Sequence, residues 1–294
     1  MFRDACKKAR AFTRPLLTVF RYVDGRFVHG AASMVIVNEE GWFITAAHLF
    51  DSLTKARAEA AEIREWTKRK LAIEGDPSLD AKRKRKQISR LSYDRNWIDH
   101  VAFFWMNGVD LAKPLATHVL HVSRAHDLAI GQIAGFDRSL FPEYPVFQNP
   151  NSDVEAGASL CRMGFPFAKT SVSADPDGSI AFGVDEVTYF PNEAMVTREV
   201  GEERSGPDGE PLPRYLETST PGLRGQSGGP VFDSKGIVWG IQSFTAHISL
   251  GFDPPDPTNT QRTVHQFLNV GVCVHPAIIQ WFMKKHGVKF ASGQ

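Results

Sequence analysis

The segment Gly225-Gln226-Ser227-Gly228-Gly229-Pro230 holds one serine between three glycines. Glycine accepts backbone angles that other residues avoid, so this segment can turn tightly and direct its N–H groups toward one point. A serine nucleophile beside donors for a developing negative charge requires that local structure. The residues on either side of the segment then indicate which fold presents it.

One possibility is a sharp turn between a buried strand and a helix, the arrangement of α/β-hydrolases, in which the acid and the histidine follow the serine. Here Val231-Phe232 is typical of a strand, and Asp233-Ser234-Lys235-Gly236 is typical of a hairpin turn. Residues 220–224, before the serine segment, resemble a loop rather than a buried strand. The sequence therefore favours a serine loop between strands, with histidine and aspartate earlier in the chain.

Composition limits the class of protein. The chain has 294 residues, 42% of them hydrophobic, with 34 Lys and Arg against 33 Asp and Glu, which excludes disordered and collagen-like proteins. No stretch approaches the roughly 20 apolar residues of a membrane-spanning helix, and the charged first ten residues lack the apolar core of a secretory signal. Cys6, Cys161 and Cys273 lie far apart, which argues against a disulfide framework or a zinc site. We therefore expect a reducing compartment, the cytoplasm.

Short apolar or alternating segments predict antiparallel strands in both halves of the chain. Hairpin turns are expected at Asp24-Gly25 and Glu40-Gly41, and a longer one over residues 201–213. A closing helix over residues 276–286 is predicted to pack through an apolar stripe made of Ile278, Ile279, Phe282 and Met283. The predicted strands include residues 17–23, 32–37, 42–45, 101–105, 118–120, 127–133, 159–163, 194–200, 214–218, 237–241 and 267–274.

Residues 51–95 interrupt this strand pattern. They hold 13 Lys and Arg against 8 Asp and Glu, which gives a net charge of +5. The rest of the chain holds 21 Lys and Arg against 25 Asp and Glu, which gives a net charge of −4. Apolar spacing predicts an amphipathic helix with Asp51 or Ser52 as its N-cap and Gly75 at its end. A second, basic helix is expected from near Ser78 to about Leu91. Basic helices are usually solvated, but this insertion is also a candidate site for a partner or an anionic ligand. No fold motif supports nucleic-acid binding as the main function.

Two further motifs precede the serine. Thr45-Ala46-Ala47-His48 ends one apolar strand, and Asp127-Leu128-Ala129-Ile130 begins another. Together with the serine segment, and in this order, they resemble the three catalytic signatures of the trypsin-like (chymotrypsin-fold) serine peptidases. The resemblance is closest to the bacterial branch with HtrA-type and glutamyl-endopeptidase-type enzymes. It covers roughly residues 17–285 apart from the insertion.

The resemblance implies a mainly β fold of two six-stranded antiparallel β-barrels. The first is expected over residues 15–135, interrupted by the helical insertion 51–95, and the second over residues 146–294 with the terminal helix. The implied activity is hydrolysis of peptide bonds in a protein or peptide through an acyl-enzyme, with no metal or organic cofactor. The rival function is a catalytically silent scaffold of the same fold that binds other proteins.

The same resemblance assigns roles to individual residues. His48 takes the proton from the Ser227 hydroxyl, which is a weak nucleophile on its own. Asp127 holds the imidazole in the correct tautomer and stays ionised. The backbone N–H groups of Gly225 and Ser227 stabilise the tetrahedral oxyanion.

Other residues compete for these roles. Asp99 and Asp110 also lie between the histidine and the serine, but only Asp127 opens an alternating apolar strand. Three histidines, His118, His121 and His126, lack the spacing of a metal site, so we expect ordinary surface or core histidines.

The sequence indicates the substrate-binding residues less clearly than the catalytic ones. The resemblance implies that Pro221 and Gly222 form the base of the primary pocket and that Gln242, Ser243 and Phe244 form the strand that pairs with the substrate. None of these is acidic, so a preference for Lys or Arg has no anchor, and we expect a small or apolar residue before the scissile bond.

Gln226 occupies the position where zymogen-type relatives have an aspartate that pairs with a newly cut N-terminus. An uncharged amide cannot form that ion pair. We therefore expect that activity needs no N-terminal cleavage.

Overall fold

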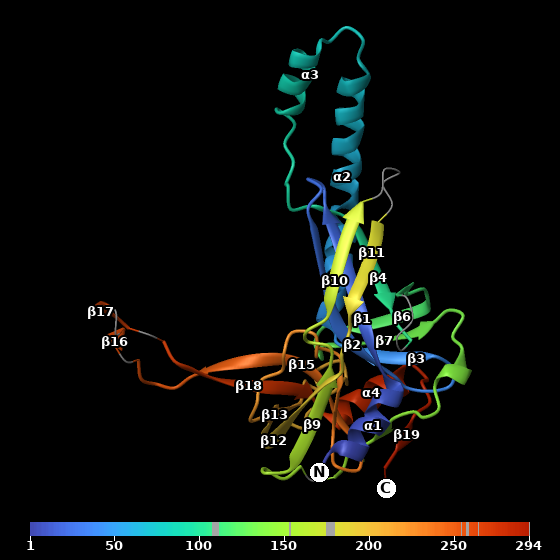
Figure 1. The fold of residues 1–294 in the computed structure, drawn as a ribbon, viewed down its shortest axis with the longest axis vertical. Helices are drawn as coiled ribbons and strands as arrows, with labels where there is room; N and C mark the ends of the chain where they lie inside the picture. Colours follow the sequence, from blue (N-terminus) through green and yellow to red (C-terminus); the bar gives the residue numbers. More distant parts are fainter. Residues whose placement is uncertain are drawn as a thin grey trace.

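The protein is described by a computed structural model that covers residues 1–107, 112–152, 154–174, 180–253, 255–256, 259–263 and 265–293. Two β-sheet units form the body, and a helical projection, α2 (Asp51–Gly75) and α3 (Ala81–Ile88), stands on one side of it (Figure 1). The two chain ends lie near each other, at the opposite end of the molecule from this projection (Figure 1). This arrangement confirms the predicted mainly β architecture with an inserted helical segment.

The first sheet has the antiparallel order β5-β4-β1-β2-β3-β7-β6. Gly25 and Gly41 adopt positive φ angles of 88° and 78°, in agreement with the two predicted hairpin turns. Among the described residues the edge strands β5 and β6 do not pair with each other, so this sheet curls without closing. Its strands are β1 (Thr13–Tyr22), β2 (Phe27–Ile36), β3 (Trp42–Thr45), β4 (Ile98–Trp105), β5 (Lys113–Pro114), β6 (Thr117–Ser123) and β7 (Leu128–Ile133).

The second sheet closes into a six-stranded barrel. Its strands follow the order β14-β9-β12-β13-β18-β15, and a further pairing of β14 with β15 completes the ring. The polar segment 201–213 joins β12 to β13, as predicted, with Val200 paired to Tyr215. The strands are β9 (Ser159–Gly164), β12 (Phe190–Val200), β13 (Tyr215–Thr218), β14 (Pro230–Phe232), β15 (Val238–Ser249) and β18 (Phe267–Val274). The short strand β8 (Val146–Phe147) pairs with β15, and β19 (Ala291–Ser292) pairs with β8.

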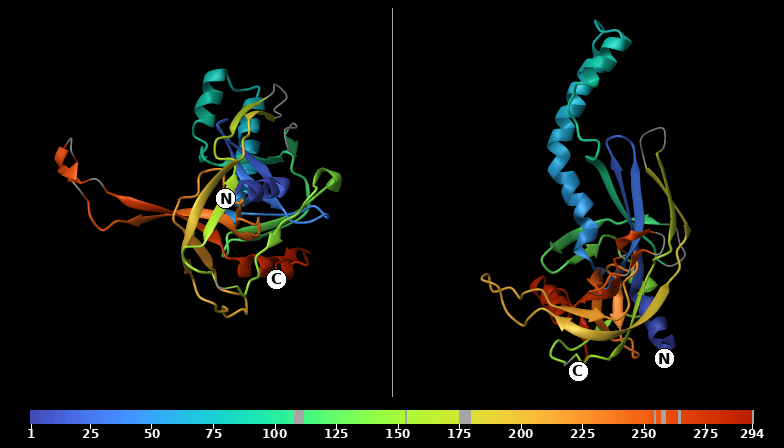
Figure 2. Two further views of the ribbon diagram at one scale, coloured as in Figure 1. Left: turned by 60° about the horizontal axis from the view of Figure 1, so that its bottom comes forward. Right: turned by 90° about the vertical axis from the view of Figure 1, so that its left-hand side faces the viewer.

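Two hairpins extend beyond these sheets. The first, β10 (Lys169–Ala174) with β11 (Ile180–Glu186), lies beside the β1–β2 hairpin in both views of Figure 2. His29 Nδ1 is 2.7 Å from Thr170 Oγ1, and the Phe104 and Phe182 rings stack at 5.0 Å. The second hairpin, β16 (Pro255–Asp256) with β17 (Asn259–Thr263), lies at the end of the arm formed by β15 and β18 (Figure 1).

The helical insertion forms where the sequence predicts it, but its first helix, which was predicted to be amphipathic, has no fully buried residue. Helix α2 ends at Gly75 as predicted, whereas its N-cap is Phe50, without a side-chain cap. None of its residues is fully buried, because most of the helix stands away from the body (Figure 2). Helix α3 is shorter than predicted and is capped by Asp80, whose Oδ1 accepts a hydrogen bond of 2.7 Å from Arg83 N.

The two terminal helices close the body at the end opposite the projection (Figure 1). Helix α4 (Pro276–Lys285) buries the four apolar residues of its predicted stripe. Helix α1 (Arg3–Phe12), which the sequence analysis did not predict, buries Ala5, Ala9 and Phe12 in the same apolar cluster. Short 3₁₀ turns are η1 (Ala47–Phe50) and η2 (Arg138–Leu140). Within the described residues, every helix is too short or too polar to span a bilayer.

Candidate active site

His48 and Asp127 meet at the end of the first sheet. His48 lies in η1, directly after β3, and Asp127 directly precedes β7, which pairs with β3. His48 Nδ1 is 2.9 Å from Asp127 Oδ2, and the backbone N–H of His48 donates to Asp127 Oδ1 at 2.9 Å. Asp127 is the one non-glycine residue with positive φ, 50°, among those the structure describes. Such a strained backbone angle persists only where surrounding contacts impose it.

Ser227 lies in the loop between β13 and β14, as the sequence predicts. Gly225 and Gly228 adopt positive φ angles of 100° and 81°. A Cβ atom at Gly228 would lie 2.0 Å from Thr45 Oγ1 of the first sheet, so this position requires glycine for space as well as for φ. The backbone N–H of Ser33, on β2, donates to Ser227 O at 2.9 Å. The first sheet thus holds the serine loop of the second.

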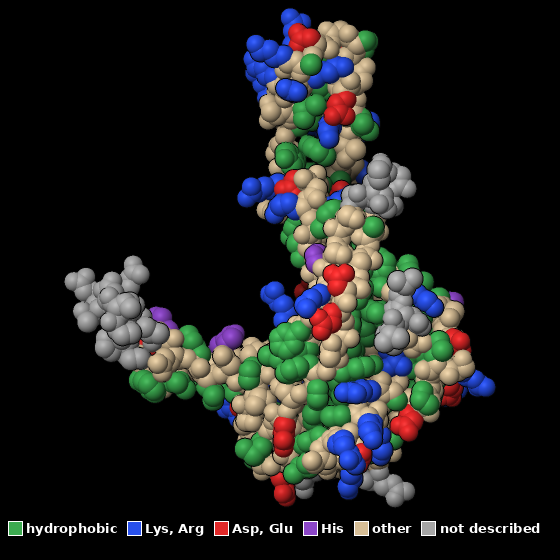
Figure 3. All heavy atoms as spheres, in the orientation of Figure 1, with side chains coloured by type: hydrophobic (Ala, Val, Ile, Leu, Met, Phe, Trp, Pro, Cys, Tyr) green, Lys and Arg blue, Asp and Glu red, His purple; other side chains and the backbone are tan. Residues whose placement is uncertain are grey.

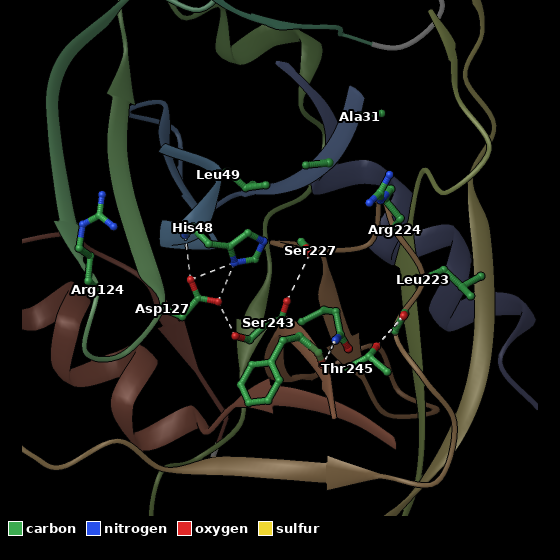
Figure 4. Close-up of a pocket in the computed structure, with 15 residues that line it drawn as sticks. Ala31, His48, Leu49, Arg124, Asp127, Leu223, Arg224, Ser227, Ser243 and Thr245 are labelled. Carbon is green, nitrogen blue, oxygen red and sulfur yellow. Dashed lines mark hydrogen bonds and ion pairs between the residues drawn. The ribbon is translucent and has the colours of Figure 1, made fainter. Parts of the chain in front are cut away.

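The three side chains face one cavity of about 590 Å³. Figure 4 shows the His48 ring between Asp127 and Ser227. Ser227 Oγ donates to the backbone oxygen of Ser243 at 3.3 Å, and no hydrogen bond joins it to His48 among the described residues. Contacts of this kind are often long or unmade before substrate binds.

Ser243 also supports Asp127. Its hydroxyl donates to Asp127 Oδ2, so the carboxylate receives hydrogen bonds from His48 and from the second barrel (Figure 4). From the sequence, Ser243 was expected only on the substrate strand. Nothing in the sequence signals its contact with Asp127, because the two residues are 116 positions apart.

These contacts set the charge of the pair. Partial burial disfavours charged His48, but the hydrogen bond and the negative charge of Asp127 outweigh it and raise the pKa of His48 above 6.5. Burial alone would raise the pKa of Asp127, but its bonds with His48 and Ser243 and the charge of His48 hold that pKa below its ordinary value. Asp127 is therefore ionised, and the imidazole is a stronger base than a free one.

The backbone N–H groups of Gly225 and Ser227 border the cavity and donate to no other residue that the structure describes. The carbonyl of Gly225 points away, accepting from Ser33 Oγ at 2.8 Å and from Phe165 N at 3.1 Å. These two bonds fix the peptide that precedes Gln226. The two N–H donors are thus available to a developing negative charge at the cavity.

Gln226 is fully buried and satisfied by the neighbouring strand. Its Nε2 donates to Asn192 Oδ1 at 2.7 Å and to Phe190 O at 3.1 Å. Its Oε1 accepts from the backbone N–H of Leu223 at 2.9 Å. This amide network anchors the serine loop without an ion pair.

The predicted substrate residues gather at one end of the cavity. Gly222, Gln242, Ser243 and Phe244 line it, whereas Pro221 is not among its lining residues. Thr245, which was not predicted from the sequence, also lines the cavity, and its Oγ1 donates to Gly222 O at 2.7 Å. We call the part lined by Gly222, Gln242, Phe244 and Thr245 the primary subsite.

The insertion borders the same site. A second cavity of about 740 Å³ shares His48, Leu49 and Arg124 with the first. Its other side is lined by β1 and by the first turns of α2, including Asp51 and Lys55. Arg124 and Asp51 form an ion pair across the boundary between the two cavities.

The structure places the other aspartates and histidines that we considered for catalysis or metal binding as follows. Asp99 pairs with Arg21 at 3.0 Å, and Asp110 lies outside the described residues. The ring nitrogens of His126 lie 2.7 Å from Ser123 Oγ and 2.8 Å from Pro211 O. His121 stacks on His286 with ring centres 3.9 Å apart, and His118 lies on β6. No group of metal-binding side chains occurs among the described residues.

Three comparisons with known proteins were made. The family model described as "Trypsin-like peptidase domain" matches residues 32–241, whereas no curated protein matches the sequence. Among solved structures, the HtrA-type protease AlgW with tripeptide superposes on this chain with a TM-score of 0.52. A variant of AlgW in which alanine replaces a serine, also with tripeptide, superposes with a TM-score of 0.53. Both are 13% identical to this chain and cover 98% of it, while the chain covers 65% of theirs. At this identity the likeness concerns the fold.

Proposed function

This chain belongs to the family of trypsin-like peptidase domains, and from that membership we propose that it is a serine endopeptidase that uses His48, Asp127 and Ser227. One observation carries the proposal. Residues from three distant segments face one cavity, with a charged aspartate bonded to the histidine and the serine beside it. A binding scaffold has no need of this arrangement, and no observation favours that rival function.

The chemistry begins at Ser227. Its Oγ attacks the carbonyl carbon of the scissile bond while His48 Nε2 takes the hydroxyl proton. Asp127 remains ionised and stabilises the imidazolium through Nδ1. The carbonyl oxygen, now negative, accepts from the N–H groups of Gly225 and Ser227, each contributing about 3 kcal/mol in comparable sites.

The intermediate then collapses. The C–N bond breaks as His48 returns the proton to the leaving amine, which leaves an acyl group on Ser227. Water attacks the acyl carbon while His48 takes a proton from that water. The ester C–O bond then breaks as His48 gives this proton to Ser227 Oγ, which restores the serine hydroxyl. His48 serves as the base both when the acyl-enzyme forms and when it is hydrolysed, so no metal or organic cofactor enters the proposed reaction.

The buried amide network of Gln226 supports activity without N-terminal cleavage. It holds the serine loop through Asn192, Phe190 and Leu223, which do not depend on a new chain end. We therefore propose that activity needs no N-terminal cleavage. Activity that appears only after trimming near Arg14 or Arg21 would contradict this.

The three cysteines are free thiols. Burial raises the pKa of the Cys161 and Cys273 thiols, which keeps them protonated and unreactive. A reducing compartment, the cytoplasm, is the location that we propose.

The end of the insertion is proposed to bind an anionic partner. Lys and Arg side chains gather at the end of the projection (Figure 3), where α3 carries Lys82, Arg83, Lys84, Arg85 and Lys86. Of these five, Arg83 alone forms an ion pair with a described residue, Asp80. Replacing all five by Gln should lower the salt concentration that elutes the chain from an anionic matrix. Unchanged elution would contradict the proposal.

Cleavage of a mixed peptide library, read by mass spectrometry, tests the proposed activity. We expect the wild-type chain to cut and Ser227→Ala to lose cleavage by about a millionfold, as in other dissected triads. Ser173→Ala, an exposed serine on β10, is the matched control and should cut like wild type. Folded wild-type protein that cuts nothing, or a Ser227→Ala variant that still cuts, would contradict the proposal.

A further inference from the structure

Strands β15 and β18 continue beyond the barrel as an arm (Figure 1). Strand β14 pairs with β15 only as far as Ile241, and β13 pairs with β18 only over Gly271–Val274. Beyond these limits, residues 246–249 pair with residues 267–270 and with no other strand among those described. A two-stranded ribbon is marginally stable in water by itself, so a third strand would stabilise the arm.

One face of the arm is apolar and partly uncovered. Successive side chains of a strand point to opposite faces, so every second residue shares a face. On this face Phe244 is 47% exposed and Leu268 is 49% exposed. Hydrophobic side chains are visible along the arm in Figure 3. Contiguous exposed apolar side chains mark interaction sites. The residues of the apolar face are Phe244, Ala246 and Ile248 on β15 and Leu268, Val270 and Val272 on β18.

The free edge of β15 begins beside the nucleophile. Gln242 still exchanges two backbone hydrogen bonds with the serine loop, at 2.7 and 2.9 Å. The next residue, Ser243, directs its carbonyl oxygen to Ser227 Oγ at 3.3 Å. From Ser243 to Ser249 this edge has no strand partner among the described residues. At about 3.3 Å per residue, the free edge extends about 20 Å from the site.

The direction of β15 determines which part of a bound chain lies on the arm. Strand β15 runs outward from the site and pairs antiparallel with both β14 and β18. A further antiparallel strand on its free edge therefore runs toward Ser227, and the part on the arm precedes the scissile bond. The residue opposite Ser243 is the first before that bond, and the residue opposite Ser249 is the seventh. Backbone groups alternate between the two edges, so Thr245, His247 and Ser249 present their N–H and C=O groups to this strand.

We propose that the free edge and the apolar face form an arm subsite, which binds residues four to seven before the scissile bond as a third strand. The inference rests on the proposed peptidase function and adds a site beyond Gln242, Ser243 and Phe244, the residues expected from the sequence. Apolar side chains at the second, fourth and sixth positions would lie on the apolar face, where cross-strand pairs stabilise a sheet. The free edge of β18, over residues 267–270, leads to β13 and not to a catalytic residue, which favours the β15 edge.

Binding of peptides to the full-length Ser227→Ala variant tests the arm subsite without turnover. Acetylated peptides of three, five and seven residues end in alanine and carry valine at every even position counted from that end, with serine elsewhere. Calorimetry gives their affinities. We expect the affinity to rise about tenfold from three to seven residues, because four more residues pair with the arm. Equal affinities for three and seven residues would overturn the proposal.

N-methylation of single residues in the seven-residue peptide tests strand pairing without a variant of the arm. A methyl group removes one N–H donor, and only every second N–H of a paired strand faces its neighbour. We expect a loss of about tenfold in affinity at the fifth residue from the end, opposite His247, and little loss at the fourth and sixth. Losses without this period of two, or losses confined to the last three residues, would overturn the proposal.

Two further variants, in the Ser227→Ala background, locate the subsite on the arm. Ile248→Asp places a charge on the apolar face and should remove the gain from three to seven residues. Leu140→Asp, at a 47% exposed residue on η2, outside the arm, is the matched control and should keep the gain. The opposite pattern would contradict the assignment to the arm.

A second copy of this chain is the other occupant that a free strand edge could take. Sedimentation tests for it. A dimer that Ile248→Asp dissociates, together with equal binding of the three- and seven-residue peptides, would assign the edge to a second copy and overturn the proposal. Because these experiments measure binding and library cleavage measures turnover, the arm subsite and the proposed catalysis can fail separately.

Discussion

At the scale of single residues, the site depends on one carboxylate held from two directions. Asp127 receives hydrogen bonds from His48 and from Ser243, which belong to different sheets. It does so with a backbone φ of 50°, an angle that a side-chain-bearing residue adopts only at a cost. The strain and the two donors together fix where the negative charge faces the imidazole.

The pH dependence of activity tests this pair. A protonated imidazole cannot take the proton of Ser227, so kcat/KM of the wild type should fall as the pH drops through a pKa above 6.5. Asp127→Asn should lower kcat by about ten-thousandfold and move this acid limb to lower pH, because the charge that raises the His48 pKa is gone. Rates measured across pH give both results.

Asp99→Asn is the matched control, since Asp99 pairs with Arg21 away from the site. It should keep the wild-type rate and the wild-type acid limb. An Asp127→Asn variant whose acid limb stays in place would contradict the assigned role of Asp127.

At the scale of helices and strands, the elements that were predicted correctly are those with a clear pattern of glycine or apolar residues within the segment itself. The hairpins at Gly25 and Gly41, the four buried residues of α4 and the end of α2 at Gly75 are confirmed. Helix α1 was missed, although Ala5, Ala9 and Phe12 follow helical spacing, because its many charges conceal that stripe. The β10–β11 hairpin was missed because Ser and Thr replace the alternating apolar residues that mark a strand.

Helix α1 should contribute substantially to stability. Phe12 is 2% exposed and packs in the main apolar cluster, so Phe12→Ala should lower the free energy of unfolding by about 3 to 5 kcal/mol. Leu71→Ala, on α2 and 60% exposed, should change it by less than about 0.5 kcal/mol. Denaturant unfolding of both variants checks this. Equal effects would contradict the docking of α1.

At the scale of the whole molecule, the site exists only where the two sheets meet. The first supplies His48 and Asp127, and the second supplies Ser227 and its loop. The order of three motifs led us to expect His48, Asp127 and Ser227 at one site, and the three residues line one cavity; their catalytic roles stay predictions. The support from Ser33 and Ser243 was not predictable, since contacts between residues far apart in the chain leave no local pattern. The domain limits 15–135 and 146–294 stay predictions.

Substitution of Ser33 tests whether the contact between the two sheets supports the site. Its hydroxyl, on β2, donates to Gly225 O in the serine loop at 2.8 Å. Ser33→Ala should lower the free energy of unfolding by about 1 kcal/mol and reduce kcat/KM by about tenfold to a hundredfold, because the oxyanion donors lose their alignment. Ser173→Ala should change neither quantity. Loss of stability with an unchanged rate would contradict the coupling of the sheets at the site.

The nucleophilicity of Ser227 is the central claim, and reaction with a fluorophosphonate probe measures it most directly. We predict one adduct per folded chain, mapped by peptide mass spectrometry to Ser227, present in Ser173→Ala and absent in Ser227→Ala and in denatured protein. Folded wild-type protein that forms no adduct, or an adduct on another residue, would contradict the account.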